Sequence, residues 1–397
     1  MTGSGPIFVP KGFKFSSATA GIKPSGKPDL ALILADRNAA AAALFTKNLI
    51  VAAPVEVGRR SLAKSRGQVR TVVVNSGNAN CATGHAGVAA CKRVCAELAH
   101  LLRIKPSEVF PSSTGIIGAQ LPSGKICAQL EPLLQSANSS PDHFRQFANA
   151  ILTTDTRLKL ASIPLRNGKA AVTGVAKGSG MIHPQLATML VYILTDVAAT
   201  PADLRRSLRN ACADSFNAIS IDGDTSTNDT VLLLASGVSG VQLGGVQREF
   251  EAALLEVCQS LAEQIVADGE GVHHVVRLRI EQAKDRAEAL QVARTISTSL
   301  LVKTAWAGAD PNWGRILAAV GRSGIRINPR KVTVLIGDRK VCSGSVACPF
   351  DKNIAHQELA KPESRITVRL GRGRALLNFL TTDLTAEYVK INADYST

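Results

Sequence analysis

Aromatic residues are scarce in this sequence, and long apolar runs are missing. Phe, Trp and Tyr make up 4% of the 397 residues, too few to form a platform on which nucleic-acid bases stack. The sequence contains no run of about 18 apolar residues, so a membrane-spanning helix is not expected. The N-terminal stretch MTGSGPIFVPKGFKFSSATA also lacks the charged segment, apolar block and cleavage site of a secretory signal. We therefore expect a cytoplasmic protein.

Motifs that bind metals or nucleotides are missing as well. None of the eight cysteines belongs to a C-x-x-C pair, and Cys91 and Cys95 lie at helical spacing, so reduced and mostly buried cysteines are expected. His273 and His274 are neighbours, which would face opposite sides of a strand and make a poor chelate. The segment DGDTSTND lacks the glycine and glutamate of a calcium loop, and neither a P-loop nor a complete G-x-G-x-x-G occurs. We expect no metal.

The chain is strongly basic, with 46 Lys and Arg residues against 31 Asp and Glu residues and a net charge of +15. Such a charge would suit nucleic acid, but the basic residues are spread along the chain and the densest cluster, GRSGIRINPRK, is modest. A basic surface would equally attract small anionic substrates. A basic binding protein therefore remains an alternative, although no groove-reading motif supports it.

Strand-like and helical segments alternate along the chain, which predicts an α/β protein. The apolar, mostly β-branched segments typical of strands are RTVVVNSG, KAAVTGVAK, TMLVYILTDV, VHHVVRLRI, KVTVLIG and RITVRL. Helical patterns occupy residues 86–103, 141–152, 201–216 and 247–269. Another helix is expected to begin near Glu281. The change from helix to strand near Gly269 suggests a second α/β region from about residue 270 to 397.

Polar turns rich in hydroxyls and amides follow several of the apolar strands. They are NSGNANCATG, PSSTGIIG, KGSGMIHPQLAT, SFNAISIDGDTSTNDT and GADPNWGRI. Each alone is typical of an ordinary loop, since Gly, Asn, Asp and Ser favour turns, but loops at strand ends are also where sites are built. Together with the terminal YVKINADYST, these segments resemble, in the same order, blocks of the ornithine acetyltransferase (glutamate N-acetyltransferase) family. The resemblance extends from about Lys11 to Thr397.

The resemblance implies that the chain cuts its own backbone between Ala187 and Thr188. The products would be an alpha chain of residues 1–187 and a beta chain of residues 188–397, which stay associated and pair into larger hetero-oligomers. The family fold is a layered α/β/β/α sandwich of the N-terminal-nucleophile type with a second α/β region. A new N-terminal Thr188 would carry a hydroxyl nucleophile and its own base, because an α-amine has a pKa of about 7.7–8.0.

The resemblance also assigns roles to residues elsewhere in the chain. Thr114, through its hydroxyl, and Gly115, through its backbone N–H, would hold the oxyanion formed during acyl transfer. The residues expected to contact substrate are Thr153 or Thr154, Lys177, Thr188, Glu270, Asn392 and Thr397. Read as ordinary features, an isolated lysine is more often solvated and a C-terminus more often frayed.

The reaction implied by the resemblance is acetyl transfer from N2-acetyl-L-ornithine to L-glutamate through an acetyl-Thr188 intermediate. Acetyl-CoA would be the second substrate in a bifunctional form, and no organic cofactor, membrane or nucleic-acid partner is implied. An N-terminal-threonine aminopeptidase or amidohydrolase, which would pass the acyl group to water, remains the alternative. The sequence departs from the family pattern at Val272–His274, shortly after Glu270, which leaves the surroundings of Glu270 open.

Overall fold

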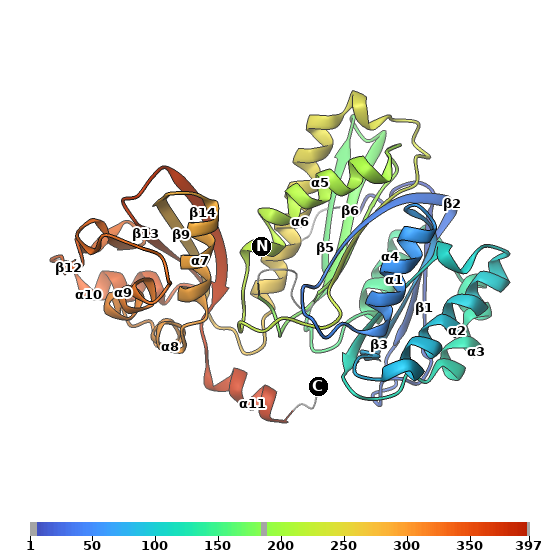
Figure 1. The fold of residues 1–397 in the computed structure, drawn as a ribbon, viewed down its shortest axis with the longest axis horizontal. Coiled ribbons are helices and arrows are strands. Elements are labelled where there is room, and N and C mark those ends of the chain that lie inside the picture. The colour runs from blue at the N-terminus through green and yellow to red at the C-terminus, as the bar shows by residue number, and fades with distance from the viewer. Residues whose placement is uncertain (1–5, 184–188, 395–397) are drawn as a thin grey trace.

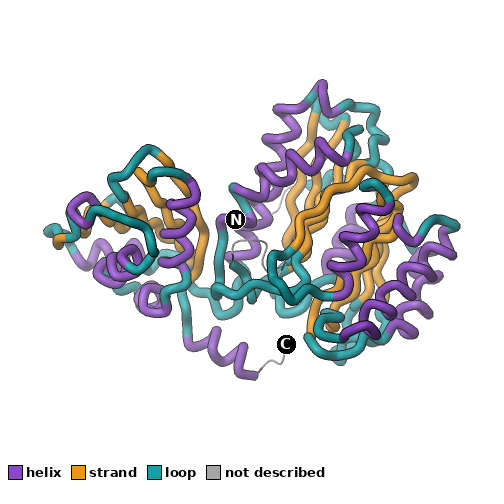
Figure 2. Tube along the Cα trace, in the orientation of Figure 1, coloured by secondary structure: helices purple, strands orange, loops and turns teal. Residues whose placement is uncertain are grey.

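The computed structural model describes residues 6–183 and 189–394, which form two sheets flanked by helices (Figures 1 and 2). The predicted site residues Ala187, Thr188 and Thr397 lie outside the described residues. The strands of the larger sheet are β1 (Phe13–Ala18), β2 (Leu30–Phe45), β3 (Gln68–Asn78), β4 (Val109–Ile116), β5 (Lys159–Leu165), β6 (Ala170–Lys177), β7 (Leu190–Thr195) and β8 (Thr230–Ala235). Neighbouring strands follow the order β4-β3-β2-β8-β7-β6-β5, and β1 pairs with β2.

Strand β2 connects two halves of this sheet. Its first part pairs with β1 and β3, and the register with β3 shifts between Leu34 and Ala39. Its last part, Ala40–Phe45, pairs with β8. Side chains from β1–β4 and from β5–β8 meet in one buried core, which contains Phe15 and Tyr192. The two halves therefore face each other as stacked layers.

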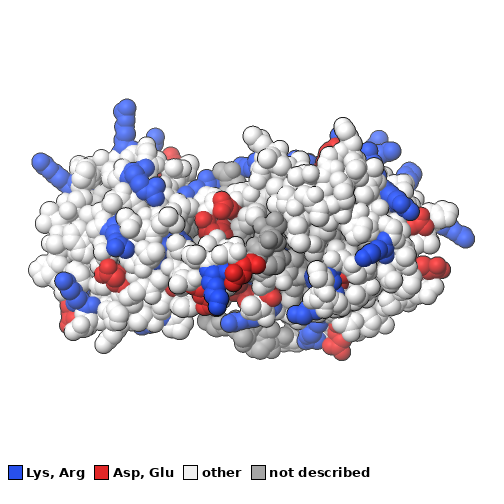
Figure 3. Space-filling model, turned by 90° about the horizontal axis from the view of Figure 1, so that it is seen from below, with Lys and Arg blue, Asp and Glu red and all other residues white. Residues whose placement is uncertain are grey.

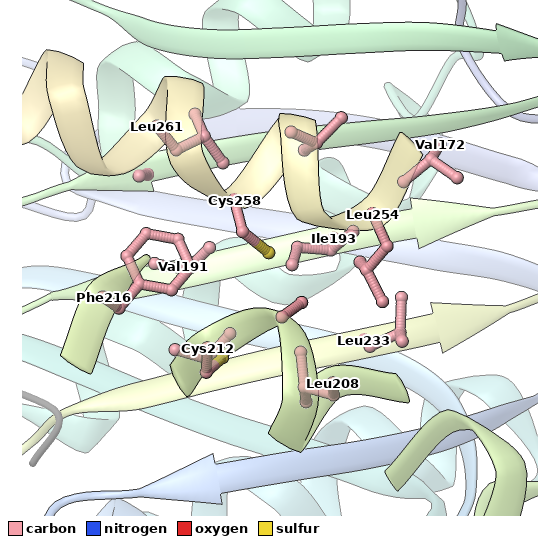
Figure 4. Close-up of a cluster of buried hydrophobic side chains, with 14 of the residues drawn as sticks. Val172, Val191, Ile193, Leu208, Cys212, Phe216, Leu233, Leu254, Cys258 and Leu261 are labelled. Carbon is pink, nitrogen blue, oxygen red and sulfur yellow. The ribbon is translucent and has the colours of Figure 1, made fainter. Parts of the chain in front are cut away.

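Helices cover the outer face of each half. Those beside β1–β4 are α1 (Ala53–Lys64), α2 (Gly84–Leu102) and α3 (Ser123–Gln135); those on the other side are α5 (Pro201–Ala213) and α6 (Gln247–Ala267). Helix α4 (Pro141–Ala150) adds Phe144 and Phe147 to the core between the halves. In the outer core of Figure 4, Leu208 of α5 and Cys258 of α6 pack with Ile193 of β7. The layers run helix, sheet, sheet, helix, which confirms the expected α/β/β/α sandwich.

The smaller sheet lies in the C-terminal part of the chain. Its strands are β9 (Val275–Ala283), β10 (Thr333–Ile336), β11 (Arg339–Ser343), β12 (Val346–Ala347), β13 (Glu363–Arg369) and β14 (Ala375–Thr382), in the order β12-β11-β10-β13-β9-β14. Its helices are α7 (Arg286–Ser297), α8 (Leu300–Ala307), α9 (Trp313–Gly321) and α10 (Lys352–Leu359). A last helix, α11 (Ala386–Asp394), returns from β14 toward the space beside the larger sheet (Figure 1).

One predicted boundary is wrong. The helix expected near Glu281 begins at Arg286, because β9 continues to Ala283 and pairs with β13 and β14 along this stretch. The side chain of Asp285 then accepts the backbone N–H of Glu288 and caps the helix. All eight cysteines are free, and six of them are buried, which confirms the expectation for Cys. Within residues 6–183 and 189–394, no helix is both long and apolar enough to span a bilayer.

Candidate active site

Polar loops at the ends of the larger sheet meet the loop before β9 and helix α11 around one cavity of about 130 Å³. Seven residues predicted from the sequence line it: Thr114, Gly115, Thr153, Thr154, Lys177, Glu270 and Asn392. They come from β4, the loop after α4, the end of β6, the loop after α6, and α11. Residues more than 270 positions apart in the sequence are thereby brought to one place. Thr188, Ala187 and Thr397 cannot be placed because they lie outside the described residues.

Thr114 and Gly115 stand at the end of β4, where this strand runs parallel to β3. Gly77 is the register partner of Gly115. Gly115 has a φ of +132°, and a Cβ at this position would lie 2.3 Å from the carbonyl carbon of Gly77. Only glycine fits between two backbones at that distance. The tight pairing thus fixes the direction of the Gly115 N–H, which is what an oxyanion donor requires.

Lys177 is the last residue of β6, and only 2% of its surface is exposed. Its Nζ donates a hydrogen bond of 3.2 Å to the hydroxyl oxygen of Thr114. Because an ammonium group is only a donor, Thr114 accepts this bond with its oxygen and keeps its own O–H free to donate elsewhere. Burial lowers the pKa of Lys177, while the nearby Asp155 carboxylate raises it. Lys177 is therefore not a solvated surface residue, which is the usual place of an isolated lysine.

Both threonines of the LTTDT segment reach the cavity. The hydroxyl oxygens of Thr154 and Ser179 are 2.7 Å apart and share a hydrogen bond. The backbone N–H of Thr153 donates to the carboxylate of Asp155 over 3.1 Å. Both side chains line the same cavity, so the choice between them stays open.

Glu270 and Asn392 meet across the other side of the cavity. The amide Nδ2 of Asn392 donates to Glu270 Oε2 over 3.0 Å, so the C-terminal helix reaches the cavity, and substrate binding by Asn392 stays a prediction. His273 instead lies 3.3 Å from Glu387 through its Nε2, and His274 contacts the carbonyl of Lys361. The unusual segment Val272–His274 contributes no residue to the described lining of the cavity.

Several lining residues were not singled out from the sequence. They are Ala79, Ile117, Ser179, Gly180, Met181, Asp222, Asp224, Ser226, Thr227, Asn228 and Tyr388. The motif SIDGDTSTNDT pointed to this part of the chain, but its spacing did not show which side chains turn inward. Acidic side chains also gather near the middle of the face shown in Figure 3, whereas Lys and Arg are scattered over it.

Asp222 has a distinct place among these residues because it holds the start of the predicted cleavage segment. Its carboxylate accepts the backbone N–H groups of Met181 and Ile182. Met181 adopts a φ of +56°, which is uncommon for a residue other than glycine. Burial raises the pKa of Asp222 to about 6. Burial and Asp222 together raise the pKa of Tyr388, which lies beside it.

Comparison with known proteins places the chain in a family. The family model of the ArgJ family matches residues 14–397. The chain is 42% identical over 396 residues to the arginine biosynthesis bifunctional protein ArgJ of Chlorobaculum tepidum, covering 99% of this chain and 97% of the relative. It is 43% identical over 393 residues to the protein of the same name from Thermus thermophilus, covering 98% and 100%. A solved structure of the ArgJ protein of Bacillus halodurans is 36% identical with a TM-score of 0.50, over 51% of this chain and 98% of the other.

The layered fold gathers hydroxyl, amide and lysine groups at its strand ends, an arrangement that suits an acyl-transfer enzyme. The family match extends over nearly the whole chain, and the chain therefore belongs to the ArgJ family. This confirms the family that the ordered motifs indicated.

Proposed function

We propose that this chain is a cytoplasmic acetyltransferase of arginine biosynthesis that moves acetyl from N2-acetyl-L-ornithine to L-glutamate. The observation that carries the proposal is the convergence of Thr114, Gly115 and Lys177 on one cavity, directly beside the start of the strand that follows Thr188. The relatives are named bifunctional proteins of arginine biosynthesis, and a second reaction, acetylation of glutamate by acetyl-CoA, fits that name.

The nucleophile in this proposal is Thr188, freed by cleavage of the bond between Ala187 and Thr188. The free α-amine, with a pKa of about 7.7–8.0, takes the hydroxyl proton while the hydroxyl oxygen attacks the acetyl carbonyl. The oxyanion that forms is held by the Thr114 hydroxyl and the Gly115 N–H. When the intermediate collapses, the bond to ornithine N2 breaks, and the α-ammonium returns its proton to that nitrogen.

The second half of the reaction runs the same steps with glutamate. The neutral α-amine of glutamate attacks the acetyl ester, its proton passes to the Thr188 amine and then to the departing hydroxyl, and N-acetylglutamate leaves. Lys177, Glu270, Asn392, Thr397 and one of the two threonines of LTTDT bind the substrates. Lys177 is suited to a carboxylate and Glu270 to an ammonium group, and both kinds of group occur in the substrates.

The sheet supplies a reason for the two fragments to stay together after cleavage. β6 pairs with β7 in antiparallel register from Lys177 with Leu190 to Val172 with Thr195. β6 would belong to the alpha chain and β7 to the beta chain, and β2 and β8 form a second such pair. Separating the chains would break both ladders and expose the cores on either side. An αβ unit is therefore the smallest assembly expected, and it supports a hetero-oligomer.

A Thr188→Ala variant tests the proposal. Intact mass and a denaturing gel should show two fragments, divided before Thr188, for the native protein and one full-length chain for the variant. The native protein should convert N2-acetylornithine and glutamate to ornithine and N-acetylglutamate, and the variant should not. Release of free acetate without acetylglutamate would instead support the N-terminal-threonine hydrolase. A variant that still splits at this bond would show that another residue is the nucleophile.

A further inference from the structure

We propose that Asp155 is a positioning residue that holds Lys177 against Thr114 and keeps the lysine in its charged form. This inference rests on the proposed function, because it gives Lys177 and Thr114 their task in acyl transfer. It assigns a role to a buried carboxylate that does not itself line the cavity.

The geometry around Asp155 is that of a fixed anchor. Its side chain is fully buried. One carboxylate oxygen accepts the backbone N–H of Gly178 over 2.6 Å and the Nζ of Lys159 over 2.7 Å, and the other accepts the N–H of Thr153 over 3.1 Å. Lys177 Nζ lies 3.9 Å away. A carboxylate held by three donors cannot turn away, so it presents a fixed negative charge to Lys177.

The charged groups around Lys177 form a network of carboxylates and lysines. Lys159 bridges Asp155 and Asp268, with Nζ 2.7 Å and 2.6 Å from the respective carboxylates. The titratable groups that act on Lys177 are Asp155, Lys159, Asp229, Glu270 and, from the N-terminal loop, Lys23. Among the causes acting on the pKa of Lys177, burial is the largest and lowers it, and Asp155 is the largest that raises it. Lys177, Lys159 and the Gly178 N–H in turn hold the pKa of Asp155 at about 2, although burial opposes them.

The charge state of Lys177 decides what the Thr114 hydroxyl can do. A charged ammonium only donates, so Thr114 must accept and its proton stays available for the oxyanion. A neutral amine has a lone pair and can accept that proton, which would turn the hydroxyl away from the developing negative charge. Loss of one oxyanion donor costs about 10²–10³-fold in kcat. Asp155 therefore acts on catalysis through Lys177 and Thr114 without touching substrate.

The experiment compares the pH dependence of kcat in three variants. Asp155→Asn removes the charge that supports Lys177, so the alkaline decline in kcat should begin about 1 pH unit lower or more. Lys159→Met removes a neighbouring positive charge that lowers the pKa of Lys177, so the decline should move to higher pH. Asp268→Asn is the matched control. It also replaces a buried carboxylate bonded to Lys159, but makes no described contact with Lys177, and it should leave the decline where the native protein has it.

An alkaline decline of Asp155→Asn that superimposes on that of the native protein would overturn the proposal, as would equal shifts in Asp155→Asn and Asp268→Asn. If Asp155→Asn does not fold, Lys159→Met still tests the proposal, because a decline that stays in place would show that the charge of Lys177 does not control kcat. A second readout is a ¹⁵N NMR titration of labelled lysine side chains, with the Lys177 signal assigned from Lys177→Arg. It should show the same ordering of Lys177 pKa values. If the native protein forms no acetylglutamate, the proposed function fails, yet this titration still tests the role of Asp155.

Discussion

Replacing Gly115 by alanine should damage both the fold and the reaction, because the new methyl group has no space. Its Cβ would lie 2.3 Å from the carbonyl carbon and 2.7 Å from the Cα of Gly77, and 2.5 Å from the nitrogen of Asn78. All three atoms belong to the backbone of β3, which is paired on its other side with β2. No side-chain rotation can relieve such contacts, so β4 must move away from β3.

The expected cost has two parts. Forcing a methyl group into a packed site costs about 1–3 kcal/mol, and holding a residue other than glycine at a positive φ costs about 1–2 kcal/mol more. The sum, roughly 2–5 kcal/mol, is a large share of the 5–15 kcal/mol by which domains are stable. The shift of β4 also moves the Gly115 N–H away from the oxyanion, so kcat should fall about 10²–10³-fold.

Urea unfolding measures the first effect, and steady-state kinetics on the folded fraction measures the second. Gly118→Ala is the matched control, since Gly118 also has a positive φ, +87°, but a Cβ there would meet no atom within 4 Å. It should lose only the about 1–2 kcal/mol that its positive φ costs and keep its kcat. If Gly115→Ala loses no more stability than Gly118→Ala and retains native kcat, the tight pairing of β3 and β4 is not what sets the oxyanion donor.

Two further variants test the remainder of the cavity. Asp222→Asn removes a carboxyl group whose pKa burial raises from 3.8 to about 6. Because Asp222 binds its proton more tightly in the folded protein than in the unfolded chain, the native protein becomes more stable as the pH falls below 6 and the buried carboxylate is neutralised. Thermal melts should therefore show the native protein gaining stability over Asp222→Asn between pH 7 and pH 4, and a constant difference would contradict this. Gly271→Ala would place a Cβ 2.3 Å from the backbone nitrogen of Tyr388 and displace α11, so KM should rise on the order of 5–30-fold from lost hydrogen bonds with a smaller change in kcat. Gly240→Ala, at a φ of +76° with no atom near the new Cβ, should leave KM unchanged.

The sequence was most informative where local chemistry and structure agree. β3, β6 and β7 are β-branched and apolar, and the structure forms them within a few residues of the predicted positions. Four of the five polar turns contribute residues to the described lining of the cavity, whereas GADPNWGRI contributes none. Gly and hydroxyl residues favour turns for conformational reasons, so a turn after a buried strand can be predicted from the sequence of that segment alone.

The sequence analysis did not predict strand β2, because part of its sequence favours a helix. Its second half contains a run of five alanines, Ala39–Ala43, and alanine has the highest helix propensity. The run is a strand because it pairs with other strands along its length, Ala39 and Ala40 with β3 and Ala40–Ala43 with β8. The small side chains also suit a position on which α5 packs closely. Long-range pairing overrides local preference here, and periodicity within one segment does not reveal it.

The Asp155 network was hidden for a similar reason. Asp155 and Lys177 stand 22 positions apart, and Asp268 is 91 positions beyond Lys177. Each is an ordinary charged residue in its own segment. They become buried and paired only when the loop after α4, the end of β6 and the end of α6 come together in the fold. The family resemblance could therefore predict Lys177 as a site residue, but nothing in the sequence indicated Asp155.

The cavity divides into two sides whose origins differ. Thr114, Gly115 and Lys177 sit at strand ends of the larger sheet, where paired backbone and buried charges fix them. Glu270 and Asn392 come from the loop before β9 and from α11, and a single side-chain hydrogen bond joins them. Rigid donors suit a charge that exists only in the transition state, whereas groups on a separate helix suit recognition of substrate in both states. Changes at Thr114 and Gly115 should therefore act mainly on kcat, and changes at Glu270 and Asn392 mainly on KM, whereas changes at Lys177 should act on both because Lys177 also binds substrate. The expected difference between kcat and KM effects follows from the elements that carry the residues, the strand ends of the larger sheet on one side and a loop and α11 on the other.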